Sequence, residues 1–167
     1  MALEAARRGL ARCVVAISPC CLWKVHGAPH VDYVFASLRF MATRFPHILK
    51  MVMRTPFGRE VAMAVPLSVG SRRMPLANAR RAVDDLAAST AFEATFESTR
   101  APFSAPEIAV PVMVAFGRYD WILTKGSRYR HALPAHTRWI EKPRWGHVPM
   151  WADPAGVSGL ILEGLRV

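Results

Sequence analysis

The feature that most constrains the fold is an apolar run from Ile108 to Phe116, which holds three valines and ends at Gly117. Because the run is almost uninterrupted by polar residues, it favours a strand that is covered on both faces, as in a parallel sheet. A shorter extended run, Thr137 to Glu141, follows it. Parallel neighbours require a crossover connection, so Lys125 to Leu133 is predicted to form a helix between the two strands.

Two side chains suited to catalysis come just after these predicted strands. Asp120 follows the first strand, and His147 follows the second, 27 residues later. The carboxyl ends of parallel strands meet at one edge of a sheet, where ligands and catalytic groups gather in open α/β folds. We therefore expect Asp120 and His147 to be in contact. His147 would act as a general base, and Asp120 would fix its tautomer and stabilise the imidazolium.

The residues around this pair resemble two motifs of the α/β-hydrolase family. Gly117-Arg118-Tyr119-Asp120 is similar to the acid-bearing turn of that family, and Gly146-His147-Val148-Pro149 is similar to its histidine turn. The resemblance implies a truncated α/β-hydrolase fold with about three parallel strands, flanking helices and a helical cap. It also implies cofactor-free hydrolysis of an ester, amide, epoxide or C–C bond in a small-molecule substrate, with Asp120 and His147 as catalytic residues.

The resemblance covers nearly the whole chain and divides it into three parts. Residues 1–23 correspond to the helix after the nucleophile elbow and the next strand, residues 24–106 to the helical cap, and residues 107–167 to the C-terminal core. The expected sheet has the strand order 12–18, 109–116, 137–141. Helices are expected at about 2–9, 30–44, 46–54, from 56 onward, 75–88, about 90–98 and 154–165.

Capping residues mark several of these helix boundaries. Thr55 precedes Pro56, and Thr90 with Glu93 fits a capping box. Asp153 is the predicted N-cap of the last helix, which begins at Pro154. The predicted apolar stripe of that helix consists of Val157, Leu160, Ile161 and Leu165.

A recognisable nucleophile is missing from this sequence. The family places it on a G-x-S-x-G turn, which exposes the serine hydroxyl, and no such turn occurs here. Ser158 and Ser71 are preceded closely by glycine but lack the motif. Three accounts remain: a fragment or mis-started reading frame with the nucleophile before Met1, a degenerate non-catalytic product, or a substitute nucleophile at Cys20 or Cys21.

The same truncation would leave one strand of the sheet without a neighbour. In the family another strand pairs with the one that corresponds to residues 12–18. An uncovered apolar edge promotes association, so self-association through strand 12–18 is expected.

Composition excludes several other classes of protein. Lys and Arg number 22 against 12 Asp and Glu, a net charge of +10, but the basic residues are scattered, as in the pairs Arg72-Arg73 and Arg80-Arg81. No nucleic-acid partner is therefore expected. The three cysteines are too few for a disulfide framework, and the N-terminus lacks a signal-peptide core, so a cytoplasmic location is predicted. No membrane span is expected.

Other candidate residues carry weaker signals. The remaining histidines, His26, His30, His47, His131 and His136, lack metal-binding spacing, so no metal or cofactor is expected. Trp121, Trp145 and Trp151 flank the Asp–His pair and would either wall a substrate pocket or pack against neighbours. The Met and Phe residues of the predicted helical cap would either line a pocket or form the core of the cap. The alternative function is a non-catalytic binding protein that retains part of the hydrolase fold.

Overall fold

A three-stranded parallel sheet organises the computed structural model, which describes residues 1–25, 29–64 and 69–166. The strands are β1 (Val14–Ile17), β2 (Val112–Gly117) and β3 (Arg138–Lys142), in the order β1-β2-β3. Val14 pairs with Val112, and Val114 pairs with Trp139. The predicted strand order is therefore confirmed. Every residue of β2 is buried, as its unbroken apolar sequence requires of a central strand covered on both faces.

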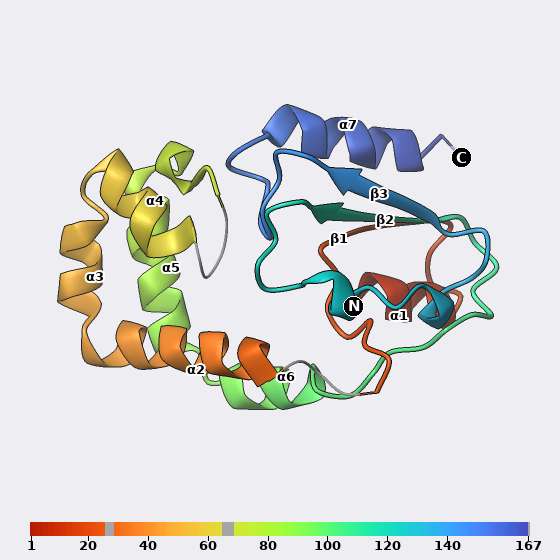
Figure 1. The fold of residues 1–167 in the computed structure, drawn as a ribbon, viewed down its shortest axis with the longest axis horizontal. Helices are drawn as coiled ribbons and strands as arrows, with labels where there is room; N and C mark the ends of the chain where they lie inside the picture. Colours follow the sequence, from red (N-terminus) through yellow and green to blue (C-terminus); the bar gives the residue numbers. More distant parts are fainter. Residues whose placement is uncertain (26–28, 65–68, 167) are drawn as a thin grey trace.

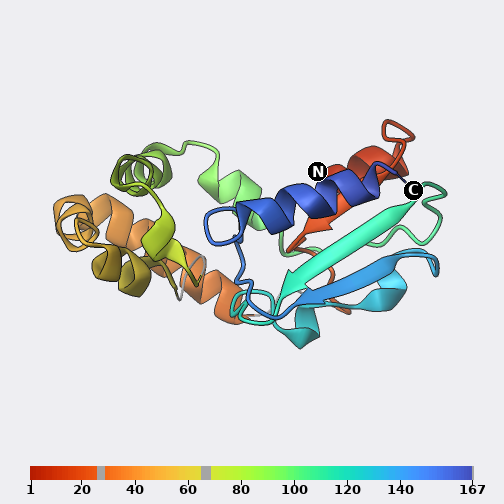
Figure 2. The same ribbon diagram turned by 90° about the horizontal axis from the view of Figure 1, so that it is seen from above.

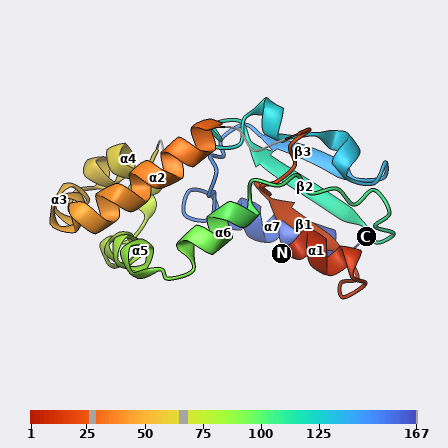
Figure 3. The same cartoon turned by 90° about the horizontal axis from the view of Figure 1, so that it is seen from below.

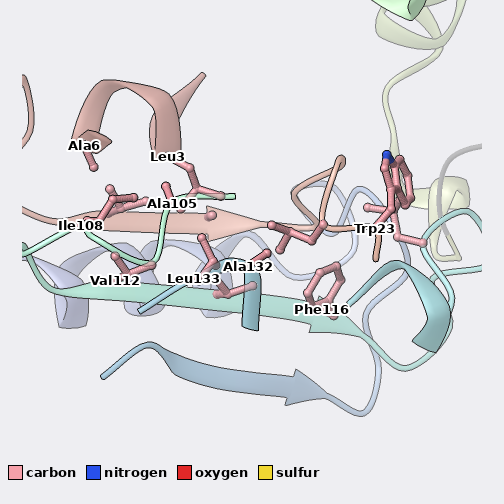
Figure 4. Packing of buried hydrophobic residues seen from close by; sticks show 14 of the residues in the cluster. Leu3, Ala6, Trp23, Ala105, Ile108, Val112, Phe116, Ala132 and Leu133 are labelled. Carbon is pink, nitrogen blue, oxygen red and sulfur yellow. The ribbon is translucent and has the colours of Figure 1, made fainter. Parts of the chain in front are cut away.

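Short helices cover the two faces of the sheet (Figures 2 and 3). On one face, Leu3 and Ala6 of α1 (Ala2–Arg7) point toward Ala105, Ile108 and Val112, as Figure 4 shows. On the other face, α7 (Pro154–Gly164) packs Val157 and Leu160 against Met113 and Ala115. Because both faces are covered, β2 lies in the middle of the α/β core, and its carboxyl end is held rigidly.

The last helix begins where the sequence predicts but buries a different stripe. Asp153 is its N-cap, since the Asp153 carboxylate accepts a hydrogen bond of 2.9 Å from the Gly156 N–H. Ile161 and Leu165 were expected to be buried and are instead exposed, which corrects the predicted stripe. Gly164 is the buried residue at the end of the helix, because only a residue without a side chain lets the helix approach Val15 of β1.

Two glycines of α7 give a matched test of this packing. A Cβ on Gly164 would lie 2.2 Å from Cγ2 of Val15, whereas a Cβ on Gly159 would meet nothing within 4 Å. We expect Gly164→Ala to lower the free energy of unfolding by about 1–3 kcal/mol through overpacking. Gly159→Ala should raise it by about 0.5–1 kcal/mol, because alanine reduces the entropy lost on helix formation. Urea unfolding measures both; equal effects in the two variants would contradict the packing.

Residues 29–98 contribute a helical segment that lies beside the sheet rather than on its faces (Figure 1). Its elements are α2 (Pro29–Arg44), α3 (Pro46–Val52), α4 (Pro56–Ala64), the 3₁₀ helix η1 (Ser71–Arg73), α5 (Leu76–Ala88) and α6 (Phe92–Ser98). This segment has a core of its own, made by Ala42, Met53, Met63, Met74, Ala79 and Val83. The helical segment is therefore packed around this core, while Val31 and Phe35 of α2 pack against the core of the sheet.

The caps of the helical segment follow the sequence in one place and depart from it in another. The Thr55 hydroxyl accepts a hydrogen bond of 3.0 Å from the Gly58 N–H at the start of α4, as predicted. The predicted capping box of Thr90 and Glu93 is wrong: α6 begins at Phe92 with Ala91 at the N-cap position and no side-chain cap. The helix starts too late for Thr90 to reach its first N–H groups.

The connection from β2 to β3 corrects the predicted crossover helix at Lys125 to Leu133. Two 3₁₀ turns, η2 (Lys125–Ser127) and η3 (Arg130–Ala132), replace it. The Tyr129 N–H donates to the Leu22 carbonyl, and the Ala132 carbonyl accepts from the Ala105 N–H. These backbone groups are used to bind other segments, so they cannot close an α-helix.

Strand β1 lies at the edge of the sheet and has one unpaired side. The N–H groups of Val14 and Ser18 donate to β2, so alternation along the strand directs those of Val15 and Ile17 to the other side. A groove of about 490 Å³ runs beside this edge, between the N-terminal residues Met1 and Ala2 and the loop near Phe103.

Among the helices of the described ranges, none combines the length and apolar character needed to cross a bilayer.

Candidate active site

Asp120 and His147 are in direct contact at the carboxyl ends of β2 and β3. Nδ1 of His147 lies 3.0 Å from Oδ2 of Asp120. The second oxygen, Oδ1, accepts hydrogen bonds from the N–H groups of Ile122 and Leu123 at 3.1 and 2.8 Å. The Asp120 side chain is completely enclosed, whereas the His147 side chain retains 19% exposure. Asp120 is thus a fixed acceptor, and His147 is the member of the pair that can meet a ligand.

Backbone contacts between the two turns set this geometry. The Arg118 N–H donates to the Lys142 carbonyl at 3.0 Å, and the Tyr119 N–H donates to the Trp145 carbonyl at 2.9 Å. Gly117 lies so close to Trp145 that a Cβ there would be 2.2 Å from the Trp145 carbonyl oxygen. The glycine that ends the apolar run is therefore needed because the histidine turn packs directly on it.

The charge state of Asp120 suits an orienting carboxylate. Burial by itself raises the pKa of Asp120, but the hydrogen bond and charge of His147 and the N–H of Leu123 outweigh it, so the pKa lies below its usual value. An ionised carboxylate can only accept hydrogen bonds, so Nδ1 of His147 must be the donor. In the neutral ring, Nε2 then carries a lone pair and can accept a proton.

A largely apolar cavity of about 320 Å³ opens beside His147. We call it the apolar pocket. Its floor comes from Ser18 and Cys20 after β1 and from Ile122 and Leu123 after β2. Its other residues lie in or near the helical segment, and they are Trp23, Val31, Phe35, Ser89, Phe92, Thr95, Phe96 and Thr99. The pocket therefore joins the carboxyl edge of the sheet to the helices.

Aromatic side chains form the helical wall of the apolar pocket. The Phe96 ring lies 5.7 Å from Phe35 and 5.8 Å from Phe92, centroid to centroid. The Trp23 indole N–H donates to the Thr99 carbonyl at 2.9 Å, which ties the exit of β1 to the end of α6. The imidazole of His30 links the start of α2 to the turn after β2, because its Nε2 lies 2.9 Å from the Ile122 carbonyl oxygen.

Some of the aromatic residues and methionines considered in the sequence line the apolar pocket, and others do not. Phe35, Phe92 and Phe96 line the pocket, whereas the buried methionines of the helical segment form its core. Trp121, Trp145 and Trp151 do not line it: Trp145 is buried under the sheet, and Trp151 packs on the helical core. Sequence reasoning missed Trp23, which also lines the pocket.

Cys20 lines the apolar pocket, and Cys21 follows it in the chain. The Cys21 thiol donates to Sγ of Cys20 at 3.4 Å, and both cysteines are free. This hydrogen bond lowers the pKa of Cys20 to about 6 against the opposing effect of burial, and the same bond raises the pKa of Cys21. Of the two candidate thiols, Cys20 borders the same pocket as His147.

The other candidates lie elsewhere. Ser158 is exposed on α7, and Ser71 belongs to η1 of the helical segment. His136 bonds to the Val110 carbonyl at 3.0 Å. His26 lies outside the described residues. Within the described ranges, no three His, Cys, Asp or Glu side chains are grouped so that they could hold a metal ion.

Comparison with known proteins gives structural matches only. No family model matches the sequence, and no curated protein matches it. The crystal structure of MGS-M2, an α/β hydrolase enzyme from a Medee basin deep-sea metagenome library, matches 99% of this chain with a TM-score of 0.62 at 13% identity. An enol-lactonase from Burkholderia xenovorans LB400 matches 99% with a TM-score of 0.59 at 17% identity.

A membrane phospholipase A, described as a novel bacterial virulence factor, matches 99% of this chain with a TM-score of 0.61 at 19% identity. The chain spans 61% of MGS-M2, 61% of the enol-lactonase and 52% of the phospholipase. It therefore covers little more than half of each protein that it matches. The chain has an α/β-hydrolase-like fold, truncated relative to these structures.

Proposed function

We propose that this chain carries the acid and the base of a hydrolase-type triad, with Asp120 as the orienting acid and His147 as the general base. The observation that carries the proposal is the 3.0 Å contact between His147 and an enclosed Asp120 at the border of an apolar pocket. A base held by a third group is the arrangement that activates a nucleophile or a water molecule.

The apolar pocket supports a small, largely apolar substrate. Its volume of about 320 Å³ and its wall of Phe35, Phe92 and Phe96 suit a short acyl chain or one aromatic ring. In this proposal residues 24–106, which include the helical segment, form the cap that closes over the substrate. The scissile bond would lie against His147, and an ester is the simplest substrate to assay among the bonds that such a triad cleaves.

The proposal assigns this chain to the C-terminal part of the hydrolase fold. The free edge of β1 supports that assignment, since β1 pairs with β2 on one side only and α1 begins next to the free side. A preceding strand would pair there, and its turn into α1 would carry the nucleophile. Without that strand, the chain is expected to self-associate through β1.

The test is hydrolysis of 4-nitrophenyl butyrate by the 167-residue chain and by the longer polypeptide encoded in frame upstream of Met1. The 167-residue chain should be no faster than its His147→Ala variant. A rate in this chain that is lost in Cys20→Ala would instead identify Cys20 as the nucleophile. If neither polypeptide shows a rate that depends on His147, the proposal fails and the non-catalytic binding protein becomes the favoured function.

A further inference from the structure

A second cleft, of about 550 Å³, is lined by three arginines and two aromatic rings. We call it the arginine cleft. It lies between η1 and the turns that follow β2 and β3, and it shares no lining residue with the apolar pocket. Its arginines are Arg72, Arg73 and Arg144, and its aromatic residues are Tyr119 and Trp121. Its volume is in the range of small-ligand sites.

The turn that presents Arg72 and Arg73 is fixed by hydrogen bonds to α4. The Glu60 carboxylate accepts from the N–H groups of Gly70 and Arg72 at 2.7 and 2.8 Å. The buried Arg59 guanidinium donates to the Arg72 carbonyl at 3.3 Å. The Arg73 guanidinium donates to the Ala152 carbonyl, which anchors the turn to the segment before α7. The backbone of Arg72 and the guanidinium of Arg73 are thus fixed at the cleft before any ligand arrives.

The three arginines of the cleft outnumber the acidic residue that lines it, Asp153. Asp153 accepts hydrogen bonds from the Trp145 indole N–H at 2.8 Å and from the Gly156 N–H at 2.9 Å. Arg72 and Arg144 are exposed, and neither forms an ion pair with another residue of the described chain. Guanidinium groups in this state favour phosphate, which they can bind through paired N–H donors.

Tyr119 and Trp121 add an aromatic surface to the same cleft. They flank Asp120 in the sequence and retain 46% and 49% exposure, whereas the Asp120 side chain between them is enclosed. A half-exposed aromatic ring that lies beside arginines can stack on a planar ligand. Such stacking adds to the affinity that the charges supply.

We propose that the arginine cleft binds a small phosphate-bearing ligand with a planar ring, of the size of a mononucleotide. Arg72, Arg73 and Arg144 bind the phosphate, and Trp121 and Tyr119 stack on the ring. This site is separate from the proposed hydrolase site, so one proposal can fail without the other.

Isothermal titration of the 167-residue chain with adenosine 5′-monophosphate, ribose 5-phosphate and adenosine tests the proposal. We expect the monophosphate nucleotide to bind more tightly than either of its parts. Arg72→Ala and Arg144→Ala should each weaken its binding about tenfold, the usual effect of losing a hydrogen bond to a charged group. Trp121→Ala should weaken binding of the nucleotide but leave that of ribose 5-phosphate unchanged.

Arg81→Ala is the matched control, since Arg81 is exposed on α5 and pairs with Asp85 away from the cleft. It should leave nucleotide affinity within twofold, and unfolding curves should show that all the variants are folded. Equal losses in Arg81→Ala and Arg144→Ala would mean diffuse attraction to a basic surface and would overturn the proposal. Absence of nucleotide binding to the unmodified chain would overturn it as well.

Discussion

The His147→Ala variant of the longer polypeptide is expected to hydrolyse 4-nitrophenyl butyrate about 10⁴-fold more slowly than the unmodified polypeptide. Loss of the imidazole removes the group that takes the proton from the nucleophile, and general-base catalysis contributes up to about this factor. Because KM depends on the apolar pocket rather than on proton transfer, the loss should appear in kcat. Steady-state kinetics at pH 7 measure both constants.

His136→Ala is the control for this experiment. His136 is exposed, bonds to the Val110 carbonyl and does not line the apolar pocket, so its removal should leave kcat unchanged. The upstream polypeptide should contain a predicted strand and a glycine-flanked serine just before Met1. An upstream sequence without them, or a kcat that survives the loss of His147, would contradict the proposed function.

Removal of the Asp120 carboxylate should lower the stability of the fold strongly. Asp120→Ala leaves the buried N–H groups of Ile122 and Leu123 and the His147 Nδ1 without an acceptor. Each unsatisfied buried group costs about 1–3 kcal/mol, and water entering the space recovers part of it. We expect the free energy of unfolding to fall by about 3 kcal/mol, as measured by urea denaturation with an unchanged slope.

Asp120→Asn separates the two duties of the carboxylate. The amide oxygen can still accept from the two backbone N–H groups, so the loss should be about 1 kcal/mol, mostly from the His147 contact. Asp85→Ala, at an exposed position on α5, should change stability by less than about 0.5 kcal/mol. A loss in Asp120→Ala no larger than in Asp85→Ala would show that the enclosed carboxylate is not needed.

The difference in the free energy of unfolding between the unmodified chain and Asp120→Asn should become smaller as the pH falls. The folded state lowers the pKa of Asp120, so the ionised carboxylate stabilises the fold at pH values above its unfolded pKa, about 3.9. As the pH falls through the lower, folded pKa, the carboxylate becomes protonated and the stabilisation disappears. The two unfolding curves should therefore converge in acid.

The sheet and the Asp–His pair were predictable because strong local signals specify them. The unbroken run Ile108 to Phe116 requires a strand covered on both faces, and Gly117 marks the residue where that strand ends. Parallel pairing then brings the ends of β2 and β3 together, so Asp120 and His147 must be close. Similarly, Asp153 before Pro154 identifies the start of α7 without any tertiary information.

The parts that sequence reasoning missed depend on contacts between distant segments. Lys125 to Leu133 has enough residues for a helix, but its backbone groups bond to Leu22 and Ala105 instead. Gly164 is buried and Ile161 exposed because α7 approaches Val15, which no periodicity in the helix can reveal. The arginine cleft combines η1 with turns more than 40 residues away, so its arginines read as separate solvated charges in the sequence.

The most direct test of the central claim is the tautomer of His147, measured by long-range ¹H–¹⁵N NMR at a pH where its ring is neutral. The signal is assigned by its absence in His147→Ala. Because the enclosed Asp120 carboxylate accepts from Nδ1, we predict the Nδ1–H tautomer, and we predict that Asp120→Asn shifts the ring toward the Nε2–H form. An Nε2–H tautomer in the unmodified chain, or a spectrum unchanged by Asp120→Asn, would contradict the account.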